Sequence, residues 1–170
     1  MSSSAARPVS AETSSTRARS ARGIRRRRDV SGLPEPTGPY CWSVTHGGLV
    51  FFSGIRGIDP FTGRPDEGDR SRVRRIFEHL AVLLKASGSS PRDVLSTRVY
   101  VTDMARHRPL VNAGFTRFFG TELPARTIVE VRGLNQRDTI ELEAVAALRY
   151  RPSKTRRRGW PNVRGRRRSR

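Results

Sequence analysis

A change in hydrophobic period along the middle of the chain is the feature that most limits its possible folds. Apolar residues between positions 69 and 87 recur at three- and four-residue spacing, which predicts an amphipathic helix. A second stripe with this spacing runs from Leu110 to Phe119 and ends at Gly120. Runs rich in β-branched residues lie before, between and after the two stripes. The pattern predicts one α+β domain.

The strand-forming runs predict how the sheet is assembled. Gly47-Gly48 separates the first two runs, as expected for a hairpin. Residues 93–102 form the third run, and residues 123–131 and 139–146 form the last two. The predicted order is therefore β-β-α-β-α-β-β, in an antiparallel or mixed sheet with two helices covering one face.

Positive charge is concentrated at the two ends of the chain. Of the formal net charge of +19, residues 1–29 carry +6 and residues 151–170 carry +10, which leaves +3 for residues 30–150. Both ends contain few large apolar residues, so they cannot bury enough surface to offset the entropy of ordering. We therefore predict disordered tails at residues 1–35 and 151–170 around a domain at residues 36–150. The tails suit nonspecific binding to nucleic acid, and the alternative is a functionally neutral extension.

No stretch of the sequence reaches the roughly 18 apolar residues that a membrane span requires. We therefore expect a soluble, cytoplasmic protein without a membrane partner. The single cysteine, Cys41, excludes an internal disulfide and fits a reducing compartment. Because His46, His79 and His107 have no zinc-like spacing, no metal site is predicted. The sequence also lacks a phosphate-binding glycine loop, which argues against nucleotide-driven chemistry.

Side chains alternate between the two faces of a strand, and this selects candidate functional residues in the last two strands. Arg126, Ile128 and Glu130 share one face of the fourth strand. In the fifth strand Glu141 and Glu143 lie opposite an apolar face. We expect these two strands to pair and to project one guanidinium and two carboxylates away from the helix-covered core.

A sheet face of mixed apolar and charged side chains is poorly covered in a lone domain. We therefore expect this face to be buried against other copies of the chain in a closed oligomer. In a cleft between subunits, Arg126 would offer a planar, two-pronged match to a substrate carboxylate. The alternative is a structural role, in which Arg126 pairs with Glu141 or Glu143 across the sheet.

Several short motifs in the middle of the chain occur together in a fixed order. They are Gly38-Pro39-Tyr40, Leu49-Val50-Phe51-Phe52-Ser53-Gly54, Asp59-Pro60-Phe61-Thr62-Gly63, Asp93-Val94, Pro124-Ala125-Arg126 and Ile140-Glu141-Leu142-Glu143-Ala144. In this order and spacing they resemble the RidA (YjgF-type) family of enamine and imine deaminases. The resemblance spans residues 36–150 and covers neither tail.

The resemblance implies a chorismate-mutase-like fold and a homotrimer whose sheets form a central barrel, with active sites between subunits. It also implies hydrolysis of 2-aminoacrylate or 2-imino acids to 2-keto acids and ammonia, without a metal or an organic cofactor. In the family pattern Arg126 corresponds to the arginine that holds the substrate carboxylate. Glu141 corresponds to the acid that positions or activates water, and Glu143, on the same face, is the alternative acid.

The resemblance also indicates which residues would contact the substrate. Tyr40 corresponds to the tyrosine that lines the site, and Ser53 and Gly54 correspond to the pocket wall. Asn112 corresponds to an asparagine of the second helix near the pocket. Ile128 occupies a position, two residues after the arginine, where the family often has cysteine. Each has a structural alternative, as a packing aromatic, a strand-end hydroxyl or a polar helix position.

The chain departs from the best-known branch of the family around the expected pocket. Cys41-Trp42 replaces the usual Ser-Gln, Ile55 replaces a glutamine, and His79 replaces an asparagine. These changes predict a more apolar pocket and a substrate bulkier than 2-iminopropionate. Two other classes of function stay open: a nucleic-acid-associated protein that acts through its basic tails, and a non-catalytic sensor of carboxylate ligands.

Overall fold

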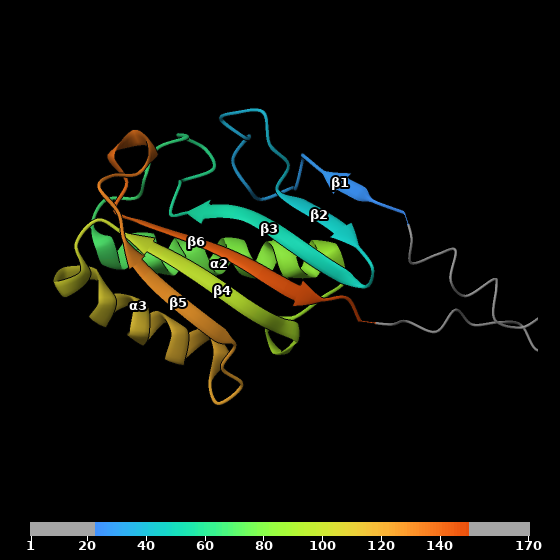
Figure 1. Cartoon of the computed structure of the whole chain (residues 1–170). Helices are drawn as coiled ribbons and strands as arrows, with labels where there is room; N and C mark the ends of the chain where they lie inside the picture. Colours follow the sequence, from blue (N-terminus) through green and yellow to red (C-terminus); the bar gives the residue numbers. More distant parts are fainter. Residues whose placement is uncertain (1–22, 150–170) are drawn as a thin grey trace, which may run out of the picture.

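The structure, a computed structural model, describes residues 23–149. These residues form two layers, a six-stranded sheet and a pair of long helices packed on one of its faces (Figure 1). In chain order the elements are β1 (Arg25–Arg27), β2 (Ser43–His46), β3 (Leu49–Arg56), α2 (Asp69–Ser87), η1 (Pro91–Asp93), β4 (Val94–Val101), α3 (Met104–Phe119), β5 (Ala125–Glu130), η2 (Asn135–Arg137) and β6 (Ile140–Ala147).

The sheet is mixed, with the strand order β1-β2-β3-β6-β4-β5. Strands β4 and β5 are parallel, and the other neighbouring strands are antiparallel. The predicted fold class and the order β-β-α-β-α-β-β are confirmed, with β1 as an additional strand. Gly47 and Gly48 join β2 to β3 with φ angles of 58° and 83°, in the left-handed region that a tight hairpin needs.

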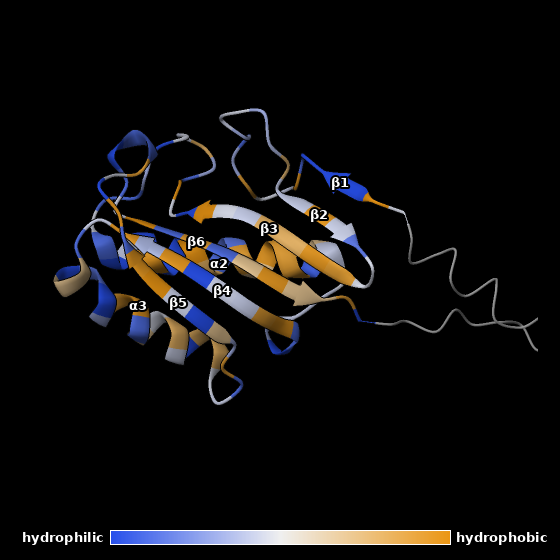
Figure 2. Ribbon diagram, in the orientation of Figure 1, coloured by the Kyte–Doolittle hydropathy of each residue, from blue (hydrophilic) through white to orange (hydrophobic). Residues whose placement is uncertain are grey.

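The hydrophobic core lies between the sheet and the two long helices. Helix α2 packs on β3 and β6, while α3 packs on β4 and β5. Alternate residues of β6 are buried on this side of the sheet, in agreement with the parity of the sequence. Figure 2 shows the result as long hydrophobic stretches on β3 and β6, in contrast to the hydrophilic β1.

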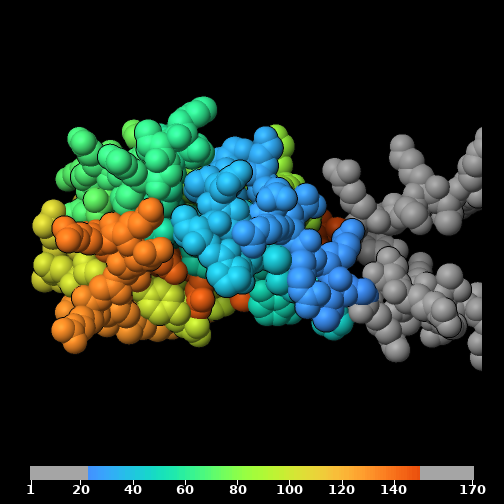
Figure 3. All heavy atoms as spheres, turned by 90° about the horizontal axis from the view of Figure 1, so that it is seen from above, coloured from blue at the N-terminus to red at the C-terminus, as the bar shows by residue number. Residues whose placement is uncertain are grey.

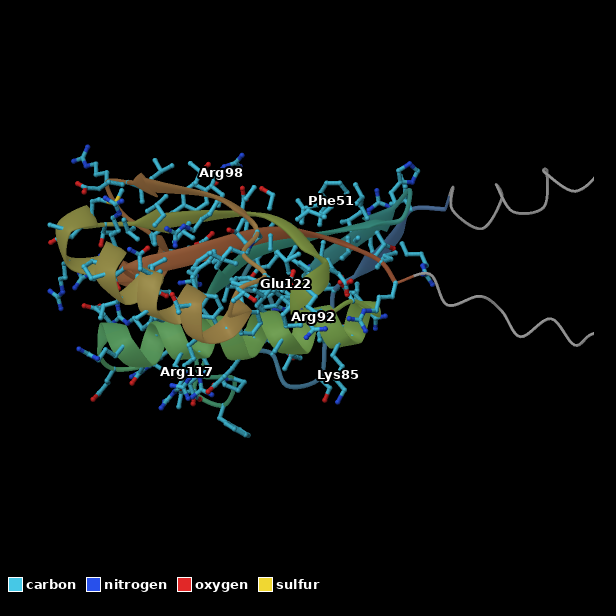
Figure 4. All side chains as sticks on the ribbon, turned by 90° about the horizontal axis from the view of Figure 1, so that it is seen from below. Phe51, Lys85, Arg92, Arg98, Arg117 and Glu122 are labelled. Carbon is cyan, nitrogen blue, oxygen red and sulfur yellow. The ribbon has the colours of Figure 1, made fainter. Side chains whose placement is uncertain are left out.

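The other face of the sheet is open. Figure 4 shows Phe51 and Arg98 projecting from it, on the side opposite Arg117 and Lys85 of the helical layer. Phe51 on β3 is 45% exposed and Val129 on β5 is 38% exposed. Apolar side chains therefore reach the surface at two separate strands of the open face. An open face of this composition is typical of a surface that contacts another protein chain.

The domain begins earlier than residue 36, the predicted boundary. Strand β1, within the predicted N-terminal tail, pairs with β2, and Figure 3 shows the segment that follows it lying against the rest of the domain. Val30 and Leu33 pack against the core, and the indole of Trp42 donates to the carbonyl of Pro34 at 3.2 Å. These contacts supply the buried surface that the arginine run itself lacks. Residues 1–22 and the predicted tail at residues 151–170 lie outside the described residues.

The expectation that the last two strands pair is wrong. Strand β4 lies between β5 and β6 and pairs with both of them. The α3 crossover returns β5 to the sheet parallel to β4, while β6 pairs antiparallel with the other edge of β4. Strand β5 is consequently at the edge of the sheet.

Neither long helix of the described region has the combined length and apolarity needed to cross a membrane.

Close approach of the two long helices depends on Gly114. A Cβ atom at this position would come within 2.5 Å of Phe77 and 2.7 Å of Val73, both on α2. These distances are shorter than van der Waals contact, so any side chain there would push the helices apart.

We predict that Gly114→Ala destabilises the domain by about 1–2 kcal/mol, because overpacking outweighs the gain in helix propensity. The matched control is Thr116→Ala at an exposed position of the same helix, with an expected change within about 0.5 kcal/mol. Urea denaturation measures both values. A Gly114→Ala variant as stable as the wild type would show that the helices separate without cost.

Candidate functional site

Glu141 is a half-buried acid on the open face of the sheet. Its register partners are Arg56 on β3 and Tyr100 on β4. Burial raises the pKa of Glu141, the adjacent Arg56 opposes this, and the negative charges of Asp138 and Glu143 add to the increase. A carboxyl whose protonated form is favoured in this way is suited to proton transfer near neutral pH.

Gly54 leaves the space that the Glu141 side chain occupies. A Cβ atom at position 54 would overlap the carboxyl group of Glu141. The pairing of β3 with β6 also shifts register between Phe52 and Ile55, so the chain bulges at this point. The bulge and the missing side chain together explain why glycine stands at this position of the pocket wall.

Tyr40 lines the same cavity as Gly54, and Ser53 directly precedes Gly54 on β3. The Tyr40 ring packs edge-on against Trp42, with 5.8 Å between the ring centroids. Ser53 donates its hydroxyl to the carbonyl of Cys41 at 2.7 Å, so it fixes the approach to β2 and retains only acceptor capacity for a ligand. Tyr40, Trp42, Gly54 and Arg56 line a cavity of about 340 Å³ that the loop at residues 60–63 closes on one side.

The residues that depart from the family pattern lie in two different environments. Trp42 borders the cavity and contributes an apolar surface to it. Ile55 instead has no exposed surface and pairs with the buried Leu142, so it belongs to the core between sheet and helices. His79 is likewise buried, on α2. The expectation that Ile55 makes the pocket more apolar is therefore wrong.

Arg126 lies on the opposite side of the sheet from Glu141, which corrects the expectation that both project away from the helix-covered core. It pairs with Thr97, a buried residue that faces the helices. Its guanidinium lies 4.5 Å from the ring centroid of Phe115 on α3, a cation–π contact. Burial and the charge of Arg108 lower the pKa of Arg126, but an arginine stays protonated at neutral pH.

The structural alternative for Arg126 does not hold within the described chain. Glu143 is paired instead with Arg98 and accepts a hydrogen bond from the hydroxyl of Tyr100 at 3.2 Å. Glu141 has Arg56 as its ion-pair partner, with 3.9 Å between Nε and Oε2. Between residues 23 and 149, Arg126 forms no ion pair with any carboxylate. Its charge is thus available for an anionic ligand.

Asn112 lies on α3, three residues before Phe115, the contact of Arg126, and Ile128 lies two residues after Arg126 on β5. Asn112 is exposed, and its backbone carbonyl accepts a hydrogen bond from Thr116. Ile128 faces the helices and is partly buried against the core. The predicted site residues therefore form two groups. We call Tyr40, Ser53, Gly54 and Glu141 the acid half, and Asn112, Arg126 and Ile128 the arginine half.

Two charged residues next to the acid half were not identified from the sequence. Arg56 is only 8% exposed and Asp138 only 2%, and their charged atoms lie 3.8 Å apart. The available signal was a charged residue, Arg56, directly after the apolar Ile55 at the end of β3. A buried charge at such a place needs a partner of opposite charge. Among the described residues no group of three or more His, Cys, Asp or Glu side chains is arranged to hold a metal ion.

Comparison with known proteins agrees with this fold. The family model described as Endoribonuclease L-PSP matches residues 31–148. A RutC family protein of Pyrococcus horikoshii is 37% identical over 118 residues, which are 69% of this chain and 93% of that protein. The 2-iminobutanoate/2-iminopropanoate deaminase of Salmonella typhimurium is 34% identical over 123 residues, 71% of this chain and 95% of that enzyme.

A solved structure gives the same result. The crystal structure of RidA from the Antarctic bacterium Psychrobacter sp. superimposes with a TM-score of 0.69 at 28% identity, covering 73% of this chain and 100% of that chain. The chain therefore belongs to the RidA (YjgF-type) family, and the family resemblance of its motifs is confirmed. Strand β1 lies before the segment that the family model matches.

The raised pKa of Glu141 predicts a pH-dependent effect of removing its charge. Because the folded state favours the protonated form, ionisation costs stability as pH rises through the usual value of 4.5, and the cost is absent below it. Glu141→Gln should therefore raise the melting temperature at neutral pH, and this gain should vanish in acid. The exposed Glu122→Gln serves as control. A Glu141→Gln variant that is less stable than the wild type at neutral pH would contradict the direction of the shift.

Proposed function

We propose that this protein hydrolyses reactive 2-imino acids, formed from enamines such as 2-aminoacrylate, to 2-keto acids and ammonia. The observation that carries the proposal is the state of two charged or titratable groups in the family's positions. Arg126 is a charged guanidinium with no carboxylate partner among residues 23–149, and Glu141 is a carboxyl with a raised pKa that lies next to Gly54 and Arg56 of the cavity wall. The naming of a relative as a 2-iminobutanoate/2-iminopropanoate deaminase supports the same chemistry.

The two halves of the site require a second subunit. Arg126 and Glu141 project from opposite faces of one sheet, with β4 between their strands. One copy of the chain cannot place both groups on one small substrate. We infer that the open face, with Phe51 and Val129, packs against neighbouring copies in a homotrimer. The acid half of one subunit then meets the arginine half of the next.

The proposed reaction needs few groups. Arg126 holds the substrate carboxylate through two parallel N–H···O hydrogen bonds and so fixes the imine carbon. The carboxylate of Glu141 takes a proton from water as the water oxygen bonds to that carbon. The protonated Glu141 then returns this proton to the nitrogen, which gives a neutral carbinolamine. Glu141 next moves the hydroxyl proton of this adduct to the nitrogen, the C–N bond breaks as the C=O bond forms, and ammonia and the 2-keto acid leave. No oxidant or reductant is required, because hydrolysis adds one water and releases one ammonia.

The cavity next to the acid half indicates the size and polarity of the substrate side chain. Its volume of about 340 Å³ and its aromatic wall of Tyr40 and Trp42 suit an apolar side chain larger than a methyl group. We therefore propose imines of apolar amino acids as better substrates than 2-iminopropionate.

We predict that Arg126→Ala lowers kcat/KM for imine hydrolysis by about 100-fold or more, because the substrate loses its anchor. The assay couples the protein to an amino-acid oxidase that generates imines from small and bulky apolar amino acids, and it follows ammonia release. The control is Arg117→Ala, an exposed arginine of the same charge on α3.

Three outcomes would contradict this assignment. Wild-type protein that binds imino or keto acids without turnover would indicate a carboxylate sensor. Salt-sensitive RNA binding that depends on the exposed arginines of β1, with Arg126→Ala harmless, would favour the nucleic-acid alternative. Equal loss of activity in Arg126→Ala and Arg117→Ala would show that activity depends on the net positive charge of the domain and not on Arg126 as a substrate anchor.

A further inference from the structure

Arg56 is a nearly buried cation next to the acid half. It ends β3, stands in register opposite Glu141, and is 8% exposed. A guanidinium withdrawn from water in this way must be compensated by acceptors and negative charge. The arrangement of those partners shows what Arg56 does.

Three groups hold the guanidinium from the side away from Glu141. Nη1 donates to the carbonyl of Asn135 at 2.8 Å, and Nη2 donates to Oε1 of Gln136 at 3.1 Å. The carboxylate of Asp138 lies 3.8 Å from Nη1 and has no exposed side-chain surface. The planar guanidinium is therefore fixed in orientation as well as in position.

The turn that supplies these partners has a strained backbone. Gln136 and Arg137 both have positive φ, at 55° and 54°, a region that residues other than glycine rarely occupy. In this turn the Asn135 carbonyl and the Gln136 side chain both lie within hydrogen-bonding distance of Arg56. Gln136 also donates through Nε2 to the carbonyl of Gly63 at 3.4 Å, which ties the turn to the loop that borders the cavity. Strain that persists in such a place points to a functional constraint.

The remaining donor of Arg56 faces the acid. Nε lies 3.9 Å from Oε2 of Glu141. No side chain among residues 23–149 donates a hydrogen bond to Glu141, and the hydroxyl of Tyr100 on the neighbouring strand donates to Glu143 instead. Arg56 is thus the one described cation that pairs with this carboxyl group, and it forms a row of alternating charge with Glu141 on one side and Asp138 on the other.

We propose that Arg56 is a positioning residue for Glu141, and that Asp138 and the strained turn hold Arg56 in place. Arg56 orients the carboxylate toward the substrate and favours its ionised form, the form that can accept a proton from water. The role in turnover rests on the function proposed above. The charge pairing between Arg56 and Glu141 does not depend on that function. The pairing and the role in turnover can therefore be tested separately.

The charged and titratable groups around Glu141 give the direction of each effect. They are Arg56 from β3, Tyr100 and the Glu143-bound Arg98 from β4, Glu143 from β6 itself, and Asp138 from the turn before β6. Loss of the Arg56 charge removes a cation and should raise the pKa of Glu141. Loss of the Asp138 charge removes an anion and should lower it.

The test measures both the acid and the reaction. Carbon-13 NMR titration of glutamate carboxyl groups, with the Glu141 signal assigned by its loss in Glu141→Gln, reports the pKa directly. The acidic limb of kcat/KM for imine hydrolysis reports it in turnover. Arg56→Met should move both upward in pH and lower kcat/KM by about 10- to 100-fold, because the carboxylate is misplaced. Arg56→Lys, which keeps the charge, should leave both near their wild-type pH.

Asp138→Asn provides the opposite shift, downward in pH, and Arg74→Met on the outer face of α2 serves as the neutral control. A merely structural role for Arg56 would lower activity or stability without moving the titration of Glu141, and that result would overturn the proposal. Should the wild type hydrolyse no imine while the NMR shifts still go in opposite directions, the pairing would stand and the deaminase assignment would fall.

Discussion

The alternation of side chains across the sheet is the constraint on which the site depends. Residues of β4 that face the helices are buried, so β5, in parallel register with it, must turn Arg126 toward the helices as well. The same rule sends Glu141 of β6 to the open face. Two groups proposed to act on one substrate are thus separated by the sheet that carries them, and association of subunits is what would bring them together.

Much of the fold could be predicted because its signals are local. The apolar stripe of α2 predicted that helix from Asp69 to Ser87, and Gly47-Gly48 predicted the first hairpin. The insertion of β4 between β5 and β6 could not be predicted, since strand order depends on contacts between distant segments. Strand β1 was missed for a related reason. Its three arginines have no hydrophobic pattern, and only pairing with β2 makes a strand of them.

The motifs predicted candidate site residues, but they did not predict how these residues are arranged in the fold. The motifs identified Arg126, Glu141 and Gly54, and the overlap of a Cβ at position 54 with Glu141 gives a physical reason for one of them. They did not reveal that Ile55 lies in the core, nor that Arg56 next to it is the ion-pair partner of the acid. Neighbouring residues of a strand face opposite sides, and the bulge at Ser53 and Gly54 changes which side that is.

The central claim is that one active site uses Glu141 of one subunit and Arg126 of its neighbour, and mixed oligomers test it most directly. Arg126→Ala and Glu141→Gln chains, each inactive alone, are given different tags, mixed by co-expression and purified through both tags. In a cyclic trimer each mixed particle contains one site with both native residues, so about one third of the wild-type activity should return. Mixed trimers as inactive as either parent, with mixing confirmed by native mass spectrometry, would contradict the shared site.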